Sequence, residues 1–383
     1  MNSPERALVG RWFATGAPIL LRWQGERILA LNPAPVAKLP ELWLAPALFD
    51  PQINGFAGTD FQRDDSDPAE LEQAANRLAA KGCARFFLTL VTDDWPRMLE
   101  RLRRLRFLRQ GSPILRRAVA GWHIEGPFLS DKPGFAGAHQ ASAMIDPSPA
   151  RVRELRRAAG KDRLLLTLAP ERKGALESIA EARRLGIRVS LGHTDASAER
   201  IEAAIRAGAE GFTHLGNGCP PRLDRRDNIL WRALALRRSL RVSLIPDGIH
   251  VAPRLFRLLH ELSPPARLFY TTDAMAGADA PPGRYSLGFL ETVVGRDGIA
   301  RLPGTEQFAG STLAPIDGVF CAARMLGVGW QSCWARMSRE AAAWLGVETN
   351  LAPGARADFC ALRFRPDGSL RQLRVFRAGE EVQ

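Results

Sequence analysis

Short apolar stretches alternate with amphipathic stretches along most of the chain, and residues that favour turns bound each apolar stretch. The apolar stretches that indicate strands are residues 42–50, 85–91, 118–126, 163–171, 188–194, 211–217, 241–248 and 267–274. Between them, segments such as 67–82 and 196–208 repeat apolar residues at helical spacing and end at a glycine. The pattern therefore predicts eight strand–helix units.

Continuous apolar strands that alternate with helices are typical of a parallel sheet covered by helices on both faces. Eight such units predict an α/β protein with a closed (β/α)8 TIM barrel. The alternative is an open, doubly wound sheet. That fold would carry a glycine-rich phosphate loop after its first strand, and residues 50–58 (DPQINGFAG) are not such a loop.

The two ends of the chain have a different pattern. Residues 18–31 indicate a hairpin around Gly25, and residues 354–383 indicate strands that turn at residues 366–368. Because neither end is long enough to bury a core alone, we expect the two to pair in space. The predicted organisation is a small β-sandwich domain from residues 1–45 and 352–383, beside a metal-dependent barrel of residues 46–351.

Composition and charge narrow the class of protein. The formal net charge of +12 suggests a nucleic-acid partner. The arginines, however, recur at the spacing of solvated helix faces in residues 101–110 and 151–160, so we expect no such partner. We also expect no membrane span, because no run of 18 apolar residues occurs. Five scattered cysteines and a first segment unlike a signal peptide predict free thiols and a cytoplasmic protein.

Polar side chains gather where the predicted strands end, which is where a barrel carries its chemistry. They are Asp50, Gln52, Asn54, Glu125, His193, His214, Asp247, His250 and Asp273. A carboxylate such as Glu125, at the end of an apolar strand, is costly to bury without a partner. Together with His193 and His214 it forms a set typical of ligands for Zn²⁺ or a similar divalent ion. His123 lies deeper on the strand of Glu125, and we interpret it as structural.

A series of motifs runs in order over nearly the whole chain. They are DPQINGFAGTDF (50–61), HIEGPFLS (123–130), GAH (137–139), LAPE (168–171), SLGHTDA (190–196), THLGNGCPP (213–221), IPDGIHV (245–251), TTDAMAGA (271–278) and FAGSTLA (308–314). With these motifs the chain resembles the N-acetylglucosamine-6-phosphate deacetylases of the amidohydrolase superfamily. The resemblance implies a homodimeric enzyme that hydrolyses the N-acetyl group of N-acetylglucosamine-6-phosphate to give glucosamine-6-phosphate and acetate.

The resemblance also implies roles for individual residues. Glu125, His193 and His214 match the metal ligands, and Asp273 matches the catalytic carboxylate. We expect Asp273 to take a proton from water and to pass it to the leaving amine. His250 matches a catalytic histidine that meets the substrate carbonyl and would stabilise the oxyanion. The remaining residues expected to bind substrate are His139, Asn217, Gly218 and Ser311.

The chain departs from the wider superfamily at the end of the first barrel strand. Many amidohydrolases carry His-x-His there and bind two metal ions, whereas this chain has Gln52 and Asn54. Neutral amides are poor ligands for a transition metal. We therefore expect one divalent ion for each chain, namely Zn²⁺, with Fe²⁺, Mn²⁺ and Co²⁺ as alternatives.

A second departure follows the sixth barrel strand. The family usually has an Arg-Glu-Pro-Gly segment there, whose arginine meets the sugar phosphate, often across a dimer interface. This chain has RLDRRDNILW (222–231) instead, which leaves Arg225 and Arg226 as candidates for that contact. A phosphate needs a positive partner, so this departure affects the identity of the substrate rather than the type of reaction.

Two other functions are compatible with parts of the pattern. One is deacetylation of another N-acetyl hexosamine, either N-acetylgalactosamine-6-phosphate or an unphosphorylated sugar, which the same strand-end residues would serve. The other is a binding or sensor protein built on an inactive barrel. The sequence disfavours the second, because Asp273 and the three expected metal ligands are all retained.

Overall fold

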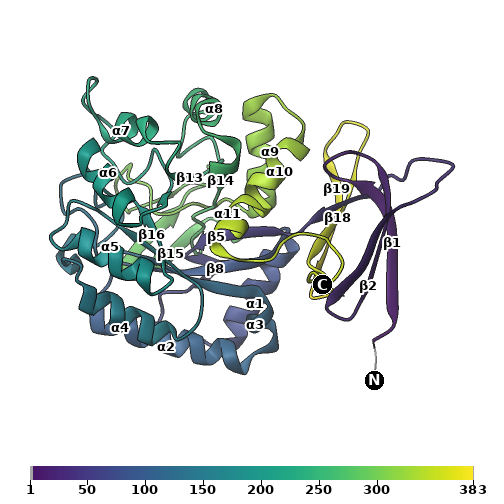
Figure 1. Cartoon of the computed structure of the whole chain (residues 1–383), viewed down its shortest axis with the longest axis horizontal. Helices are drawn as coiled ribbons and strands as arrows, with labels where there is room; N and C mark the ends of the chain where they lie inside the picture. Colours follow the sequence, from purple (N-terminus) through teal and green to yellow (C-terminus); the bar gives the residue numbers. More distant parts are fainter. Residues whose placement is uncertain (1–2, 383) are drawn as a thin grey trace.

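The computed structural model describes residues 3–382, and its main body is an eight-stranded parallel barrel surrounded by helices (Figure 1). The strands are β5 (Leu48–Ile53), β8 (Cys83–Val91), β9 (Val119–Glu125), β10 (Leu164–Leu168), β11 (Arg188–Leu191), β12 (Gly211–Phe212), β13 (Arg241–Leu244) and β14 (Leu268–Tyr270), paired in that order. A parallel bridge between Ile53 and Ala274 joins the first strand to the segment after the last. The predicted TIM barrel is confirmed.

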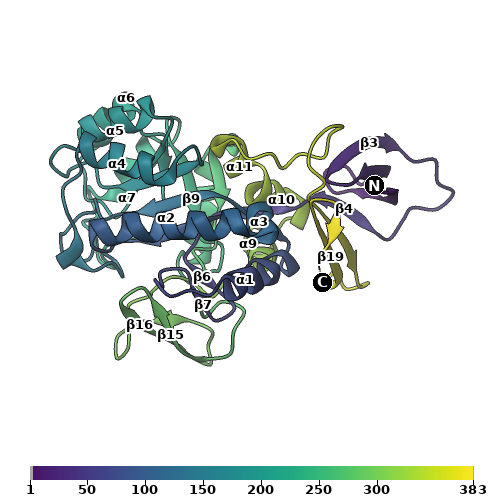
Figure 2. The same ribbon diagram turned by 90° about the horizontal axis from the view of Figure 1, so that it is seen from below.

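Helices follow most barrel strands and cover the outside of the sheet (Figures 1 and 2). They are α1 (Pro68–Ala80), α2 (Trp95–Gly111), α3 (Pro113–Ala118), α4 (Pro149–Ala159), α5 (Ala175–Arg184), α6 (Ala198–Ala207), α7 (Ile229–Ala235), α8 (Pro253–Leu262), α9 (Pro315–Leu326), α10 (Trp330–Ser338) and α11 (Glu340–Leu345). Helix α1 begins where the side chain of Asp67 accepts the N–H of Ala69, with Pro68 in the first turn. It buries Leu71 and Leu78 against the barrel, as its helical spacing predicts.

The two ends of the chain form a second, seven-stranded sheet that lies beside the barrel (Figure 1). Its strands are β1 (Glu5–Trp12), β2 (Pro18–Gln24), β3 (Arg27–Pro33), β4 (Trp43–Pro46), β18 (Phe359–Phe364), β19 (Leu370–Arg377) and β20 (Glu380–Glu381). Trp23, Phe359 and Phe376 form an aromatic core for this sheet, with ring centroids 4.3–5.5 Å apart. Both predicted hairpins, β2–β3 and β18–β19, are present; the domain boundaries at 45/46 and 351/352 remain predictions.

The sequence pattern predicts that residues 42–50 form one barrel strand, and this prediction is wrong. The structure divides this stretch between β4, which pairs with the chain-end sheet, and β5, which pairs with the barrel. The chain passes from one sheet to the other at Ala47, whose N–H donates to the carbonyl of Asp358 at 3.1 Å. Residues 44–50 are buried in both sheets, so the apolar pattern does not show where the chain changes from one sheet to the other.

Two further features are absent from the sequence-based expectation. A small sheet of β15 (Gly283–Leu287), β16 (Leu290–Val294) and β17 (Ala300–Arg301) follows the last barrel strand and lies below the barrel, near β6 (Gly55–Phe56) and β7 (Thr59–Asp60), in Figure 2. Arg101 of α2 is also not on a solvated face. It is 3% exposed, and its guanidinium lies 2.8 Å from Asp93 and 2.7 Å from Asp64.

Asp50 fastens the first barrel strand to the segment that follows the last one. Its buried carboxylate accepts hydrogen bonds from the hydroxyls of Thr271 and Thr272, both at 2.6 Å. It also accepts from the backbone N–H groups of Thr272 at 2.9 Å and Gln52 at 3.0 Å. Burial nevertheless raises the pKa of Asp50 to about 6, because the hydrogen bonds only partly replace the lost water. Among residues 3–382, no helix combines the length and apolar character needed to cross a bilayer.

The raised pKa of Asp50 predicts a pH-dependent contribution to stability. Between the unfolded pKa of 3.8 and the folded pKa of about 6, the folded state holds the proton more tightly, so the free energy of unfolding falls as pH rises. The difference corresponds to about 3 kcal/mol. We expect the free energy of unfolding of the wild type, minus that of Asp50→Asn, to fall by about 3 kcal/mol between pH 4 and pH 7 in denaturant titrations. A difference that stays constant or grows with pH would contradict this.

Candidate metal and active site

Three side chains from three neighbouring barrel strands converge at the carboxyl end of the sheet. Glu125 ends β9, while His193 and His214 lie two residues beyond the ends of β11 and β12, and all three are buried. One donor atom from each lies within 4.8 Å of the other two. Glu125 Oε1 is 2.8 Å from His214 Nε2 and 3.4 Å from His193 Nε2. This is the set that the sequence analysis expects to hold a metal ion.

Two loops fix the orientation of the His193 ring. The Nδ1 atom of His193 lies 3.0 Å from the carbonyl oxygen of Phe135, so that nitrogen carries the proton and Nε2 remains free as a ligand. Gly137 and Gly218 pack against the same ring, and a Cβ at either residue would lie 2.8 Å from a ring atom. Both glycines have positive φ angles, +57° and +62°. Glycine is therefore required at both positions for the loops to close on His193.

The backbone at this end of the barrel adopts a conformation that side chains disfavour. His193, His214 and Asp273 have φ angles of 50°, 32° and 53°, in the left-handed region that residues other than glycine rarely occupy. Each lies two or three residues beyond the last residue of its strand. Such strain persists only where the surrounding structure enforces it, and it concentrates at functional sites. Here it turns three polar side chains toward a common centre.

The electrostatics of the cluster are dominated by the charge of Glu125. Burial opposes ionisation of Glu125, but its interactions with the imidazoles of His193 and His214 outweigh burial and hold the pKa of Glu125 well below its ordinary value. Burial lowers the pKa of His214, but the hydrogen bond and charge of Glu125 outweigh burial and raise it. Burial lowers the pKa of His139, 3.7 Å from Glu125, to about 3, and burial with the charge of Glu125 raises the pKa of Asp273 to about 6. One carboxylate and two imidazoles at these separations fit one divalent ion, which would bind the imidazoles in place of a proton.

The side chains of Gln52 and Asn54 do not join the candidate ligands. The amide nitrogen of Gln52 lies 3.1 and 3.2 Å from the two carboxylate oxygens of Glu125 and 2.9 Å from Oδ1 of Asp273. The amide nitrogen of Asn54 donates to the same Oδ1 at 2.7 Å. The sequence identifies both residues as poor ligands, but it does not reveal that they are donors to Asp273.

His250 lies in the turn after β13 and is held by Asp247. Its Nδ1 is 2.6 Å from Asp247 Oδ2, and its backbone N–H donates to Asp247 Oδ1 at 2.9 Å. The ring of Phe308 lies 5.1 Å from the imidazole. Because Asp247 engages Nδ1, Nε2 is the nitrogen left to contact a substrate. The sequence places Asp247 at a strand end, and the three-residue spacing to His250 is the signal for this pair.

The other expected substrate-binding residues lie in different environments. The side-chain amide of Asn217 donates to the carbonyl of His214 at 3.2 Å, which closes the turn after β12. The hydroxyl of Ser311 donates to the carbonyl of Thr272 at 2.5 Å, and its backbone N–H donates to that of Asp273 at 2.9 Å. Arg225 and Arg226 are exposed and form no ion pair within residues 3–382. Their contacts with substrate, and those of His139 and Gly218, remain predictions.

His123 belongs to a buried polar network beneath the cluster. Its ring nitrogens lie 3.3 Å from Thr89 Oγ1 and 2.8 Å from Thr167 Oγ1. The network continues from Thr167 to Thr213 at 2.8 Å and from Thr213 to Ser190 at 2.7 Å. Burial lowers the pKa of His123 to about 4, so the ring is neutral. These contacts fit the structural interpretation of His123.

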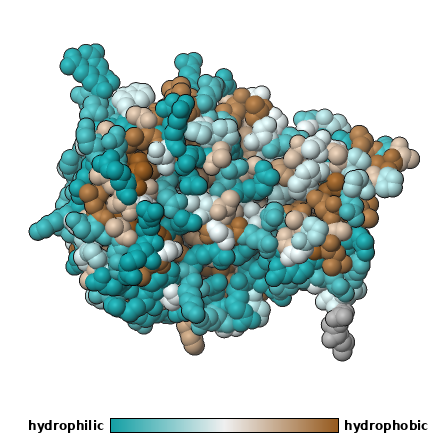
Figure 3. All heavy atoms as spheres, in the orientation of Figure 1, coloured by the Kyte–Doolittle hydropathy of each residue, from teal (hydrophilic) through white to brown (hydrophobic). Residues whose placement is uncertain are grey.

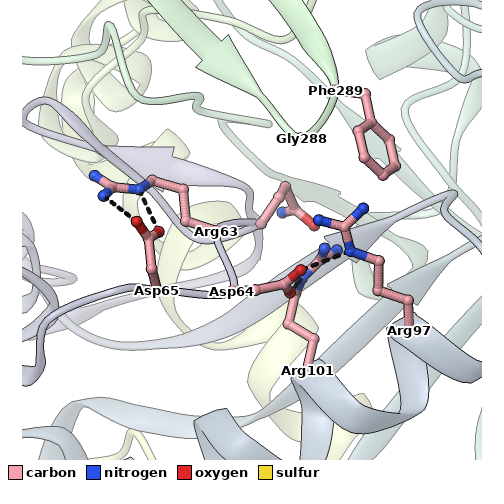
Figure 4. Close-up of a pocket in the computed structure, with 8 residues that line it drawn as sticks. Arg63, Asp64, Asp65, Arg97, Arg101, Gly288 and Phe289 are labelled. Atoms are coloured by element: carbon pink, nitrogen blue, oxygen red, sulfur yellow. Dashed lines mark hydrogen bonds and ion pairs between the residues drawn. The ribbon is translucent and has the colours of Figure 1, made fainter.

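A separate pocket of about 280 Å³ lies between α2 and the tip of the β15–β16 hairpin (Figure 4). Its arginines are already paired: Arg63 with Asp65 at 3.0 Å, and Arg97 with Asp64 at 2.6 Å. The guanidinium of Arg97 also lies 4.6 Å from the ring centroid of Phe289. Arg97 therefore fastens the nearby loop and the tip of the hairpin to α2, and Arg63 is paired within the loop, so the pocket is a poor site for an anionic substrate.

A parallel barrel that gathers a carboxylate, two imidazoles and a second carboxylate at the carboxyl ends of its strands is the architecture of a metal-dependent amidohydrolase. No protein-family model matches the chain. The N-acetylgalactosamine-6-phosphate deacetylase of Escherichia coli O157:H7 is 32% identical over 360 residues, which cover 92% of each protein. The N-acetylglucosamine-6-phosphate deacetylase of Rattus norvegicus is 33% identical over 88% of this chain and 83% of its own.

The same relationship appears among solved structures. A mutant N-acetyl-D-glucosamine-6-phosphate deacetylase from Mycobacterium smegmatis, in complex with N-acetyl-D-glucosamine-6-phosphate, matches the fold with a TM-score of 0.86. It is 32% identical in sequence, and the match covers 99% of this chain and 100% of that one. The chain belongs to the N-acetylglucosamine-6-phosphate deacetylase family.

The geometry predicts one tightly bound ion for each chain. Gln52 and Asn54 act as donors to carboxylates, so they leave only Glu125, His193 and His214 as ligands. We expect elemental analysis of purified protein to find about one divalent ion for each chain. His214→Ala should lose this ion, whereas the matched control His260→Ala, on α8, should keep it. Two tightly bound ions in the wild type, or full metal content in His214→Ala, would show that the ligand set is wrong.

Proposed function

We propose that this enzyme hydrolyses the N-acetyl group of N-acetylglucosamine-6-phosphate and releases glucosamine-6-phosphate and acetate. The observation that carries the proposal is the placement of Asp273, a partly buried carboxylate with a raised pKa, next to the Glu125–His193–His214 cluster. Family membership supports the same reaction, because the relatives are named for it.

Each group near the cluster has a role that its environment supports. A divalent ion held by Glu125, His193 and His214 would lower the pKa of water and polarise the amide carbonyl. Asp273 would take the proton of the attacking water and return it to the nitrogen of the leaving amine, which departs poorly unless protonated. Asp247 accepts from Nδ1 of His250 at 2.6 Å, and Nε2 would donate to the oxyanion when the ring carries a proton on both nitrogens.

The role of Asp273 is tested by Asp273→Asn, which keeps the shape of the side chain but cannot accept the proton. Loss of general acid–base catalysis lowers rates by about 10²–10⁴-fold. Because one group serves both proton transfers here, we expect kcat to fall by close to the larger of these factors, about 10⁴-fold. Metal content should remain near the wild-type value, because Asp273 is not among the three ligands. Turnover within about threefold of wild type would exclude Asp273 as the base.

Recognition of a 6-phosphate is assigned to the loop after β12. Arg225 and Arg226 lie on that loop, which begins at the ligand His214, and both are exposed, in contrast to the paired arginines of the pocket in Figure 4. A guanidinium without a carboxylate partner can offer its full fork of donors to a phosphate. His139, Asn217, Gly218 and Ser311 would contact the rest of the sugar, since all lie on the loops that border the cluster.

Acetate release from four substrates tests both the reaction and the phosphate contact. The panel is N-acetylglucosamine, N-acetylgalactosamine and their 6-phosphates, since one relative is named for the galactosamine compound. We expect the highest kcat/KM for N-acetylglucosamine-6-phosphate. Replacing Arg225 and Arg226 together by alanine should cost about 2–5 kcal/mol in kcat/KM for that substrate, with little effect on the unphosphorylated sugar.

The control for this experiment removes two other exposed arginines. Arg363→Ala with Arg371→Ala makes the same change of charge on the β18–β19 hairpin, far along the chain from the loop after β12, and should keep the preference. If the wild type prefers no phosphorylated sugar, the 6-phosphate assignment is wrong. If the wild type prefers it but the Arg225 and Arg226 variant keeps that preference, another group binds the phosphate.

We assign the metal as Zn²⁺, because two imidazoles and one carboxylate, with a position open for water, are typical of catalytic zinc. We also propose a homodimer. The exposed side chains of Trp231 on α7 and of Leu258 and Leu262 on α8 support it, and apolar surface is visible around α8 at the top of Figure 3. The five thiols are free in the structure, which fits a cytoplasmic enzyme.

A further inference from the structure

Two side-chain amides, Gln52 at the end of β5 and Asn54 just after it, contact two carboxylates that have different roles. Glu125 belongs to the candidate metal ligands, and Asp273 is the proposed base. Gln52 donates to both through one NH₂ group, and Asn54 donates to Asp273 alone. Both amides are 2% exposed, so no bulk water competes for these bonds. The amides therefore form a neutral bridge inside the site.

The two amide donors contact only one of the two carboxylate oxygens of Asp273. Gln52 and Asn54 both donate to Oδ1, at 2.9 and 2.7 Å. Among residues 3–382, no side-chain or backbone donor reaches Oδ2. Because Oδ1 accepts two hydrogen bonds, the carboxylate cannot rotate without breaking both of them. Oδ2 is consequently the oxygen left to exchange protons.

Neutral donors suit this position better than cations would. A guanidinium or ammonium beside Asp273 would stabilise the charged carboxylate strongly and make it a weak base. An amide fixes the oxygen without adding charge, so the carboxylate stays basic. The NH₂ group of Gln52 also separates Asp273 from Glu125, whose negative charge would otherwise act on Asp273 without an intervening donor.

The donors and their acceptor are fixed to each other by the closure of the barrel. Gln52 lies on β5 and Asn54 follows directly after its last residue, and both side-chain amides reach the same oxygen of Asp273. The backbone N–H of Asn54 donates to the carbonyl of Ala274 at 2.8 Å, next to Asp273. Asp50 binds Thr271 and Thr272 on the other side of that contact. The amides are thus held where they can define the orientation of Asp273.

We propose that Gln52 and Asn54 are positioning residues that hold Oδ1 of Asp273, so that Oδ2 alone takes and returns the proton. The catalytic consequence rests on the proposed function, whereas the orientation of the Asp273 carboxylate does not.

Variants that keep volume but remove the donor test the proposal. They are Gln52→Met and Asn54→Leu, assayed as metal-loaded enzyme with N-acetylglucosamine-6-phosphate. We expect kcat to fall by about 10–100-fold, with KM within about threefold of wild type, because the base and not the substrate is misplaced. Metal content should be unchanged. The matched control is Asn76→Leu, which removes a half-buried amide on α1 that accepts from Arg377 and should leave kcat within about threefold.

A crystal structure of Asn54→Leu supplies a readout that does not require activity. The Asp273 carboxylate should move by more than about 0.5 Å or rotate relative to wild type, the tolerance within which catalytic groups are held. An unmoved carboxylate overturns the proposal, as does kcat within threefold of wild type in both variants. Loss of metal together with kcat also overturns it, since the amides would then serve the metal site. If the wild type cleaves none of the four sugars, the proposed function fails, and the structure still tests the positioning.

Discussion

The contact between β5 and the segment after β14 is the constraint on which the rest of the site depends. A barrel has no free edge only if its first and last strands meet, and here Asp50 makes that meeting specific with three hydrogen bonds to Thr271 and Thr272. A bare apolar contact would allow the two segments to slide in register. Because Asp50 binds consecutive threonines, the register of Asp273, one residue later, is fixed relative to Gln52 and Asn54.

The second constraint is the burial of Glu125 in an otherwise apolar strand. A lone carboxylate there would be expensive, and the protein surrounds it with three imidazoles and one amide rather than with a fixed positive charge. The cluster that results could hold a cation at its centre. The strained backbones of His193 and His214 serve this arrangement, because each turns its ring inward within two residues of the end of its strand.

The sequence predicts the barrel well because apolar periodicity reports burial, and burial is what the barrel and its helices share. It predicts the clustering of Glu125, His193 and His214 for a related reason, namely that the ends of parallel strands meet in space. The sequence pattern could not predict the division of residues 42–50, since both sheets that take up this stretch bury their strands alike. It also could not predict the burial of Arg101, because its partners Asp64 and Asp93 come from other segments.

The partner of Gln52 and Asn54 cannot be predicted from the sequence. Their chemistry excludes them as ligands, but their actual partner lies more than two hundred residues away and is brought near only by closure of the barrel. The substrate-facing loops are a similar case. Gly137 and Gly218 set how closely those loops approach His193, whereas the exposed arginines beyond Gly218 have no internal partner to fix them. The rigid strand ends therefore determine the type of reaction, and the loops are free to determine which amide is brought to it.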